Sequence, residues 1–249
     1  MKRCALIIVN PGNAGQKSYC KGVFKDALNY DSFLKSPNGG YWKNDEIHTL
    51  DRKDASTVRD AIKFLQSVDY SFIAFCGHGG HSSASASVTV EIKPGVSISS
   101  DELRKGAKRH TLVLDCCRGI EKPRVLLEAA LERAYKSESL ISPDKCRKFY
   151  ETRIQECGEG IIVAHGCALG EQAGDDEELG GFYSYSLIDA AKKWIDTTVV
   201  DTKTNCCILS VPEAHDKALT GVDRMSADRQ HPKISKPRSE THFPFAIIA

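Results

Sequence analysis

The sequence lacks any long hydrophobic segment, and no apolar run approaches the roughly 20 residues that a membrane-spanning helix requires. It also lacks a charge bias, because 34 lysines and arginines face 33 aspartates and glutamates, for a net charge of +1. No overall field attracts nucleic acid or a membrane surface, so we expect neither as a partner. No internal repeat, low-complexity tract or linker divides the chain, and we expect residues 1–249 to form one domain.

A secretion signal is also missing from the start of the sequence. The apolar run Cys4–Val9 is too short for one, and no small-residue cleavage site follows it. The ten cysteines lie mostly in or beside apolar runs, and adjacent residues such as Cys116 and Cys117 are poor disulfide partners. We therefore expect reduced thiols and a cytoplasmic protein.

Strand-like and helix-like segments alternate along the chain, which predicts an α/β fold with a mainly parallel sheet covered by helices on both faces. Most strand candidates are continuous apolar runs, as expected for parallel strands that are buried on both faces. The strand candidates are Cys4–Asn10, Ile47–Leu50, Tyr70–Gly77, Thr111–Cys117, Gly160–Gly166 and Cys206–Val211. A small β-hairpin of Val88–Ile92 and Val96–Ser99 is predicted around Pro94 and Gly95.

The remaining segments give weaker signals. Tyr135–Gly158 combines lysines and arginines with serine and proline, which predicts a surface loop with one short helix. Asp223–Pro237 is polar and contains proline, which predicts a long loop. Val125–Lys136 is predicted to be a helix, and Phe243–Ile248 to dock back on the core.

Reactive side chains stand where two of the apolar runs end. One run ends at Asp115 and Cys117, and the run Phe72–Cys76 is followed by His78 between glycines. The carboxyl ends of parallel strands meet at one edge of a sheet, where ligands bind. His78 at that edge can promote the thiolate of Cys117, which makes the pair a candidate nucleophile and base. The backbone N–H groups of Gly79 and Cys117 are candidate donors to an oxyanion.

The same residues allow other interpretations. A histidine at a strand end is often a hydrogen-bonded structural residue, and a buried cysteine often acts as a small hydrophobic one. A zinc site is a further alternative, with the candidate ligands Cys76, His78, His81, Cys116 and Cys117. However, Cys116 and Cys117 would point to opposite faces of a strand and can hardly bind one ion. The spacing alone leaves these alternatives open.

Both motifs resemble those of caspases and metacaspases. Cys117-Arg118-Gly119 matches the caspase pattern of a nucleophilic cysteine before arginine and glycine, and residues 77–80 resemble the His-Gly motif of the family. Asp115-Cys116-Cys117 is similar to the Asp-x-Cys of metacaspases rather than to the Gln-Ala-Cys of animal caspases. Weaker similarities, such as Gly180-Gly181-Phe182, extend the resemblance over essentially the whole chain.

The resemblance implies a caspase-like three-layer α/β/α sandwich with about six strands, and a cysteine endopeptidase that uses a Cys117/His78 dyad. Metacaspases cut after arginine or lysine, and they bind these side chains with carboxylates. Asp115 stands in the place of the caspase glutamine and Asp26 matches a second pocket aspartate, so the resemblance implies cleavage after basic residues. Cys76 stands where metacaspases commonly have a serine, in the wall of the pocket.

Calcium dependence is not implied by the resemblance. Many metacaspases carry a calcium-binding acidic cluster after the histidine, but Gly79–Val90 contains no carboxylate. The only acidic run is Asp175–Glu178, and such a run is more often a solvated loop. We expect no cofactor to be required, with calcium as the remaining alternative.

Activation in this family often depends on cutting a loop that blocks the cleft. An enzyme that cuts after basic residues could process itself in its own basic segment. The candidate positions are Lys136, Lys145, Arg147, Lys148 and Arg153. A regulatory partner is the other activator that we expect.

The resemblance also bears on assembly and on biological role. Caspases pair through their sixth strand, and we expect Cys206–Val211 to be that edge strand or to lie near it. Metacaspases tend to be monomers, and we expect a monomer. Relatives often act in stress, cell-death or defence pathways. A caspase-like scaffold without catalysis is the alternative, although such relatives usually lose the histidine or the cysteine.

Overall fold

The computed structural model describes residues 1–81, 88–118, 142–200 and 205–249. A six-stranded sheet forms its centre, in the order β12-β8-β7-β3-β1-β2, and only β12 runs antiparallel to its neighbour. The strands are β1 (Arg3–Asn10), β2 (Ile47–Asp51), β3 (Tyr70–Gly77), β7 (Arg109–Cys116), β8 (Gly160–His165) and β12 (Lys233–Ser235). The predicted parallel sheet of about six strands is confirmed.

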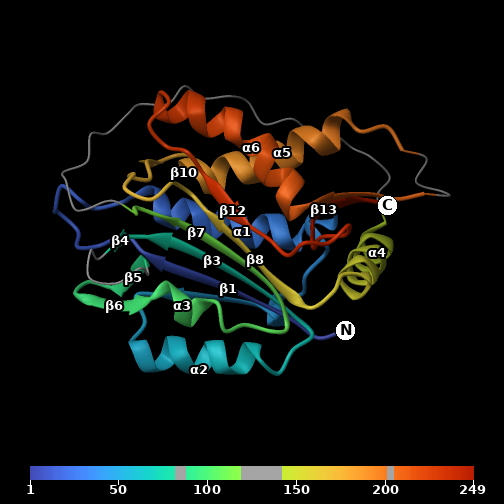
Figure 1. The fold of residues 1–249 in the computed structure, drawn as a ribbon, viewed down its shortest axis with the longest axis horizontal. Coiled ribbons are helices and arrows are strands. Elements are labelled where there is room, and N and C mark those ends of the chain that lie inside the picture. Colours follow the sequence, from blue (N-terminus) through green and yellow to red (C-terminus); the bar gives the residue numbers. More distant parts are fainter. Residues whose placement is uncertain (82–87, 119–141, 201–204) are drawn as a thin grey trace.

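Helices cover both faces of this sheet and complete the predicted three layers (Figure 1). One face carries α1 (Gly22–Lys35), α4 (Pro143–Glu156), α5 (Phe182–Thr197) and α6 (Val211–Ser226). The other face carries α2 (Ala55–Leu65) and α3 (Ser100–Leu103). Alternate residues of each strand therefore enter two separate hydrophobic cores.

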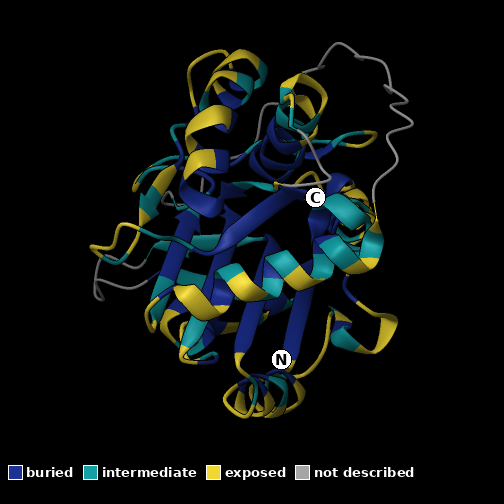
Figure 2. Cartoon of the chain, turned by 90° about the vertical axis from the view of Figure 1, so that its right-hand side faces the viewer, coloured by how far each residue is buried: buried dark blue, intermediate teal, exposed yellow. Residues whose placement is uncertain are grey.

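The pattern of buried residues explains why these segments form these elements. Strands β1 and β3 are buried along their whole length, which accounts for their continuous apolar sequences. Helix α2 buries Val58, Ile62 and Leu65, which lie on one face of the helix at spacings of four and three. Figure 2 shows the dark-blue buried strands between helices whose outer faces are exposed.

Several short elements surround the main sheet. The predicted hairpin is confirmed as β5 (Val88–Lys93) and β6 (Val96–Ser99), and β4 (Gly79–His81) extends it to three strands. The other short elements are the 3-10 helices Pro37–Gly39 and Asn44–Glu46 and the strands β9 (Asp175–Asp176), β10 (Gly180–Gly181), β11 (Cys207–Ser210) and β13 (Pro244–Ile248). The buried strand β13 confirms that Phe243–Ile248 docks back on the core.

The prediction that Cys206–Val211 forms the sixth strand of the sheet is wrong. Its residues form β11, which pairs antiparallel with β13 in a separate two-stranded sheet. The sixth strand is instead β12, which lies within the predicted loop Asp223–Pro237 and pairs with β8. Because β12 has only three residues and two of them are exposed, it carries no hydrophobic pattern that sequence reasoning can detect.

The segment Tyr135–Gly158, predicted as a surface loop with one short helix, contains the 14-residue helix α4. Its buried residues, Cys146, Tyr150 and Ile154, recur every fourth position between charged residues, and Pro143 opens the helix. Lys145, Arg147, Lys148 and Arg153 therefore lie on a helix rather than in a loop. Lys136, with the predicted helix Val125–Lys136, lies outside the described residues.

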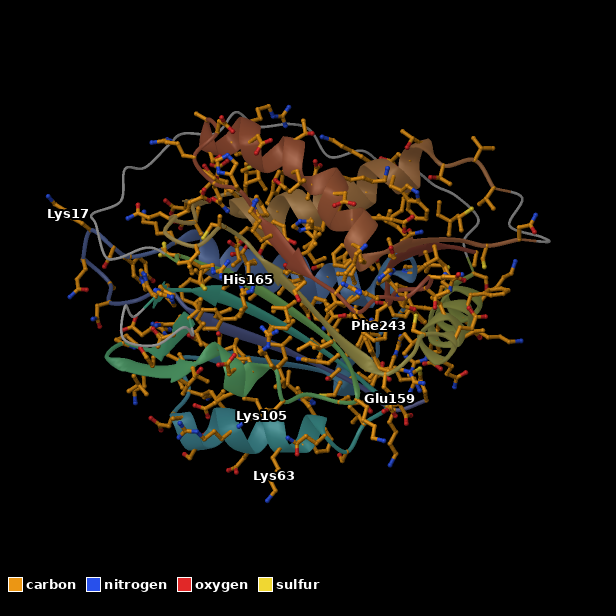
Figure 3. All side chains as sticks on the ribbon, in the orientation of Figure 1. Lys17, Lys63, Lys105, Glu159, His165 and Phe243 are labelled. Atoms are coloured by element: carbon orange, nitrogen blue, oxygen red, sulfur yellow. The ribbon has the colours of Figure 1, made fainter. Side chains whose placement is uncertain are left out.

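The parallel strands bring their carboxyl ends to one edge of the sheet. Figure 3 labels Glu159, just before β8, and His165, at its end, and the labels show that this edge lies on the left of the view. Lys17, in the loop after β1, lies on the same side. Over the described ranges, we find no helix with the length and apolar character needed to cross a bilayer.

Candidate active site

The register of the sheet places His78 beside Cys117. Gly77, the last residue of β3, pairs with Cys116, the last residue of β7. The residues that follow them, His78 and Cys117, therefore leave the sheet at the same level. Neighbouring strands lie about 4.8 Å apart. A Cβ on Gly79 would stand 2.7 Å from Cys116 Sγ and 2.9 Å from Cys117 O, so the two turns touch. The two predicted catalytic residues are therefore brought together by adjacent strand ends.

The imidazole of His78 is held by the loop that follows β1. Its Nε2 lies 3.2 Å from Pro11 O and 3.5 Å from the Cys20 thiol. A carbonyl oxygen can only accept a hydrogen bond, so Nε2 carries the hydrogen in the neutral ring. Nδ1 is then the basic nitrogen, which is the tautomer that a general base requires.

The two adjacent cysteines have different surroundings. Cys116 is fully buried in the core on the α2 side of the sheet, as predicted from the alternation of strand side chains. Cys117 is half-buried, and its Sγ lies 3.7 Å from Ala173 O. The backbone after it is fixed because Arg118 N donates to Glu171 O at 2.9 Å. Of the two cysteines, Cys117 is thus the one that lies at the end of β7, outside the core, with its backbone held by a hydrogen bond of the next residue.

The pairing of the hairpin orients the N–H of Gly79. Gly79 pairs with Val90, and the neighbouring ladder bond runs from Glu91 N to His78 O at 2.9 Å. In an antiparallel ladder, a residue at such a position directs its own N–H away from the partner strand. The N–H of Gly79 therefore points away from β5, which suits the predicted role as a donor to an oxyanion.

The three predicted pocket residues also lie together. Cys76 is paired with Asp115 in the sheet, so their side chains share the α1 face. Asp26 comes from α1, and its Oδ1 accepts a hydrogen bond from Gly181 N at 2.9 Å. Asp115 Oδ2 accepts from Ser184 N at 2.8 Å. Two acids that are 89 residues apart in sequence (115 − 26) therefore meet under the start of α5.

These side chains form a buried cluster of acidic groups. Asp26 is only 1% exposed and Asp115 is 5% exposed. Burial, and then the charge of Asp115, raise the pKa of Asp26 well above its usual range. Burial, Asp26 and Asp115 likewise raise the pKa of the Cys76 thiol. The surroundings therefore disfavour further negative charge and favour a cationic ligand.

Glycines allow the backbone to cover these carboxylates. A Cβ on Gly180 would overlap with Asp26, and a Cβ on Gly181 would overlap with Asp115. The Gly180-Gly181 pair is therefore required where β10 crosses the acids. A larger residue at either position would displace the carboxylates from their present geometry.

The acidic run Asp175–Glu178 supports the protein around this pocket. Asp175 Oδ2 accepts from Gly22 N at 3.2 Å, at the positive end of the α1 dipole. Asp176 Oδ1 accepts from the backbone N–H groups of Glu178 and Leu179, at 2.8 and 2.9 Å. In each of these contacts a carboxylate oxygen of the acidic run accepts a hydrogen bond from a backbone N–H group of the protein. In the part of the chain that the structure describes, no group of three or more His, Cys, Asp or Glu residues is arranged to hold a metal ion.

The faces of the sheet separate two of the candidate ligands of the zinc alternative, Cys76 and Cys116. Cys76 enters the core on the α1 side, whereas Cys116 enters the core on the α2 side. Two side chains on opposite faces of a sheet cannot bind the same ion.

Sequence reasoning missed several residues that hold the site. Pro11 and Cys20 contact His78 from the loop after β1. Gln230, which is 1% exposed, donates to Gly166 O at 2.7 Å and accepts from Gly174 N at 2.8 Å. The only signal for the first group is the turn-forming sequence at residues 10–12, and Gln230 lies in a segment without any pattern.

A substitution at Gly12 should disturb His78 directly. Gly12 has φ +88°, and a Cβ there would stand 2.6 Å from His78 Nε2. We expect Gly12→Ala to lower kcat for peptide hydrolysis by about 100-fold, because it displaces the imidazole. Gly15 in the same loop has φ +85° with nothing within 4 Å of its Cβ position, so Gly15→Ala carries the same backbone strain alone. Equal activities of the two variants, measured with one peptide substrate, would contradict the placement of His78.

Comparisons with known proteins agree with this architecture. The family model described as the caspase domain matches residues 2–243. Among solved structures, the chain is similar to the crystal structure of caspase-1 from Spodoptera frugiperda, with a TM-score of 0.57 and 12% sequence identity. That similarity covers 94% of this chain and 86% of the other. No curated protein matches the sequence.

Proposed function

Because the chain belongs to the caspase domain family, we propose that it is a cysteine endopeptidase that cuts peptide bonds after arginine or lysine. Membership of the family supports a cysteine peptidase acting on proteins. The observation that carries the specificity is the buried pair of carboxylates, Asp26 and Asp115, one of them two residues before the nucleophile.

The proposed mechanism begins with transfer of the Cys117 proton to Nδ1 of His78. The thiolate attacks the carbonyl carbon of the scissile bond, and the oxyanion accepts hydrogen bonds from the N–H groups of Gly79 and Cys117. His78 then returns the proton to the leaving amine, which leaves a thioester on Cys117. Water, deprotonated by the same imidazole, hydrolyses the thioester and restores the thiol. These steps use protein groups alone, so the proposed reaction needs no cofactor.

Specificity would come from charge. A guanidinium about 4 Å from a carboxylate gains on the order of 4 kcal/mol at an effective dielectric constant of about 20, before the cost of desolvation. The two acids would share the charge of an arginine or lysine side chain, with Cys76 in the wall of the pocket. An acidic side chain would meet repulsion from both.

The helix α4 limits which of the candidate positions could be cleaved in self-processing. A protease binds its substrate in an extended conformation, so cleavage at Lys145, Arg147, Lys148 or Arg153 requires α4 to unfold. Arg147 is also held by ion pairs with Glu46 at 2.6 Å and with Glu151 at 3.0 Å. Lys136, which lies outside the described residues, stays a candidate for activation by cleavage, and a regulatory partner is the alternative.

A panel of fluorogenic peptides that differ only in the residue before the scissile bond tests the proposed function. Arginine and lysine peptides should be cut with at least about 100-fold higher kcat/KM than aspartate and alanine peptides. Cys117→Ala should abolish all hydrolysis, and each assay is run with calcium and with a chelator. A preference for aspartate would contradict the pocket assignment. No hydrolysis of any peptide would favour the alternative of a scaffold without catalysis.

A further inference from the structure

Asn10 is a fully buried polar residue at the end of β1, next to the candidate active site. It is 0% exposed, and it pairs in the sheet with Gly77, the residue before His78. The backbone there is tightly packed, because a Cβ on Gly77 would overlap with Asn10 O. A buried amide must have its hydrogen bonds satisfied, so the partners of this side chain indicate what it does.

One end of the Asn10 amide shapes the loop that contacts the imidazole. Its Oδ1 accepts a hydrogen bond from Gly12 N at 3.1 Å, which closes an Asx turn around Pro11. That turn holds Pro11 O at 3.2 Å from His78 Nε2. Asn10 Oδ1 therefore fixes the acceptor that selects the tautomer of His78.

The other end of the amide holds the strand that carries the backbone of His78. Asn10 Nδ2 donates to Glu91 O at 2.7 Å and to Glu91 Oε2 at 3.1 Å. Glu91 N in turn donates to His78 O at 2.9 Å. One side chain thus connects both supports of His78, the acceptor of its ring and the partner of its backbone.

We propose that Asn10 is a positioning residue for His78, and that Glu91 acts with it. This inference rests on the proposed role of His78 as the base. Asn10 acts through the Asx turn and through Glu91, so its loss should affect the protonation and orientation of the imidazole rather than substrate binding. Loss of the Pro11 acceptor destabilises the imidazolium, so His78 takes the Cys117 proton less readily and less of the thiolate forms.

The test measures two quantities in Asn10→Ala. Its kcat for an arginine peptide should fall by about 100-fold, with KM within about threefold of wild type. The second quantity is the rate at which iodoacetamide alkylates Cys117, followed by mass spectrometry of the Cys117 peptide. At pH 6.5 this rate should be about tenfold lower than in wild type, whereas at pH 9 the two rates should be similar. Asn38→Ala is the matched control, because Asn38 also donates to a backbone carbonyl, Ile247 O at 2.8 Å, outside the site.

A reciprocal pair of variants covers the case in which Asn10→Ala does not fold. Asn10→Asp keeps an acceptor for Gly12 N but sets a carboxylate against Glu91, and adding Glu91→Gln restores a donor opposite that carboxylate. The kcat of the double variant should be at least about tenfold higher than the kcat of Asn10→Asp. No recovery would overturn the role of the Asn10–Glu91 contact.

The outcomes also separate this inference from the proposed function. Wild-type kcat in Asn10→Ala, or a loss of thermal stability with an unchanged alkylation profile, would overturn the positioning role. If wild-type protein cuts no basic peptide, the proposed function fails. The pH profile of Cys117 alkylation then still decides whether Asn10 positions the imidazole.

Discussion

Cys117→Ala and His78→Ala should each lower kcat for a basic peptide by about 10⁴-fold or more, and the double variant should be no worse than either single one. In the proposed mechanism the two side chains act as one unit, because the thiol without the base is a poor nucleophile and the base without the thiol has nothing to activate. Adjacent strand ends bring them together, and Pro11 O holds the imidazole in the required tautomer. The measurement is single-turnover hydrolysis with all three variants at equal concentration.

The neighbouring thiol supplies the control for this prediction. Cys116→Ala removes a sulfur that is fully buried in the core on the opposite face of the sheet. It should lower the free energy of unfolding by about 1 kcal/mol while kcat stays within about fivefold of wild type. Additive losses in the double variant of Cys117 and His78 would argue against a dyad.

Asp26→Asn should make the protein more stable and less active. Its pKa is raised well above the usual range, first by burial and then by Asp115, so ionisation of this carboxyl destabilises the folded state. An asparagine carries no charge and can still accept from Gly181 N. We expect Tm to rise by several degrees at pH 8, while kcat/KM for an arginine peptide falls by about 100-fold.

The pH dependence of this effect has a definite sign. Because the pKa of Asp26 is raised in the folded state, stability is greatest below the unfolded pKa of about 4 and declines as pH rises toward the folded value. The advantage of Asp26→Asn in Tm should therefore be small at pH 4 and grow toward pH 8. Asp31→Asn is the control, since Asp31 lies on the same helix and pairs with Lys35 at the surface. An advantage that is independent of pH would contradict the raised pKa.

Much of the fold follows from continuous apolar runs. Tyr70–Gly77 and the predicted strand Thr111–Cys117 are recognisable as buried parallel strands, because residues 70–77 and 111–116 are all buried. The elements that were missed contain little apolar sequence. Strand β12 is three residues long, and the full length of α4, predicted only as one short helix, rests on a buried stripe at every fourth position among charged side chains. Such elements are fixed by tertiary packing, which local patterns do not record.

The candidate site divides in the same way. His78, Cys117 and Asp115 are predictable because each follows or ends an apolar run, and the register of β3 and β7 then determines their proximity. Asp26 required the family resemblance, since a helical aspartate has no distinctive pattern. Asn10 and Cys20 escaped prediction because their roles depend on how the loop after β1 folds back onto the imidazole.

The central claim, that Cys117 is a nucleophile activated by His78 in a pocket for basic side chains, is tested most directly by covalent labelling. A peptidyl chloromethyl ketone ending in arginine should form one adduct per chain, on Cys117, with fragmentation of the labelled peptide separating it from Cys116. Labelling should be lost in Cys117→Ala, slowed by at least about 100-fold in His78→Ala, and weak for the same reagent ending in aspartate. An adduct on another of the ten cysteines, or equal labelling by the two reagents, would contradict the account.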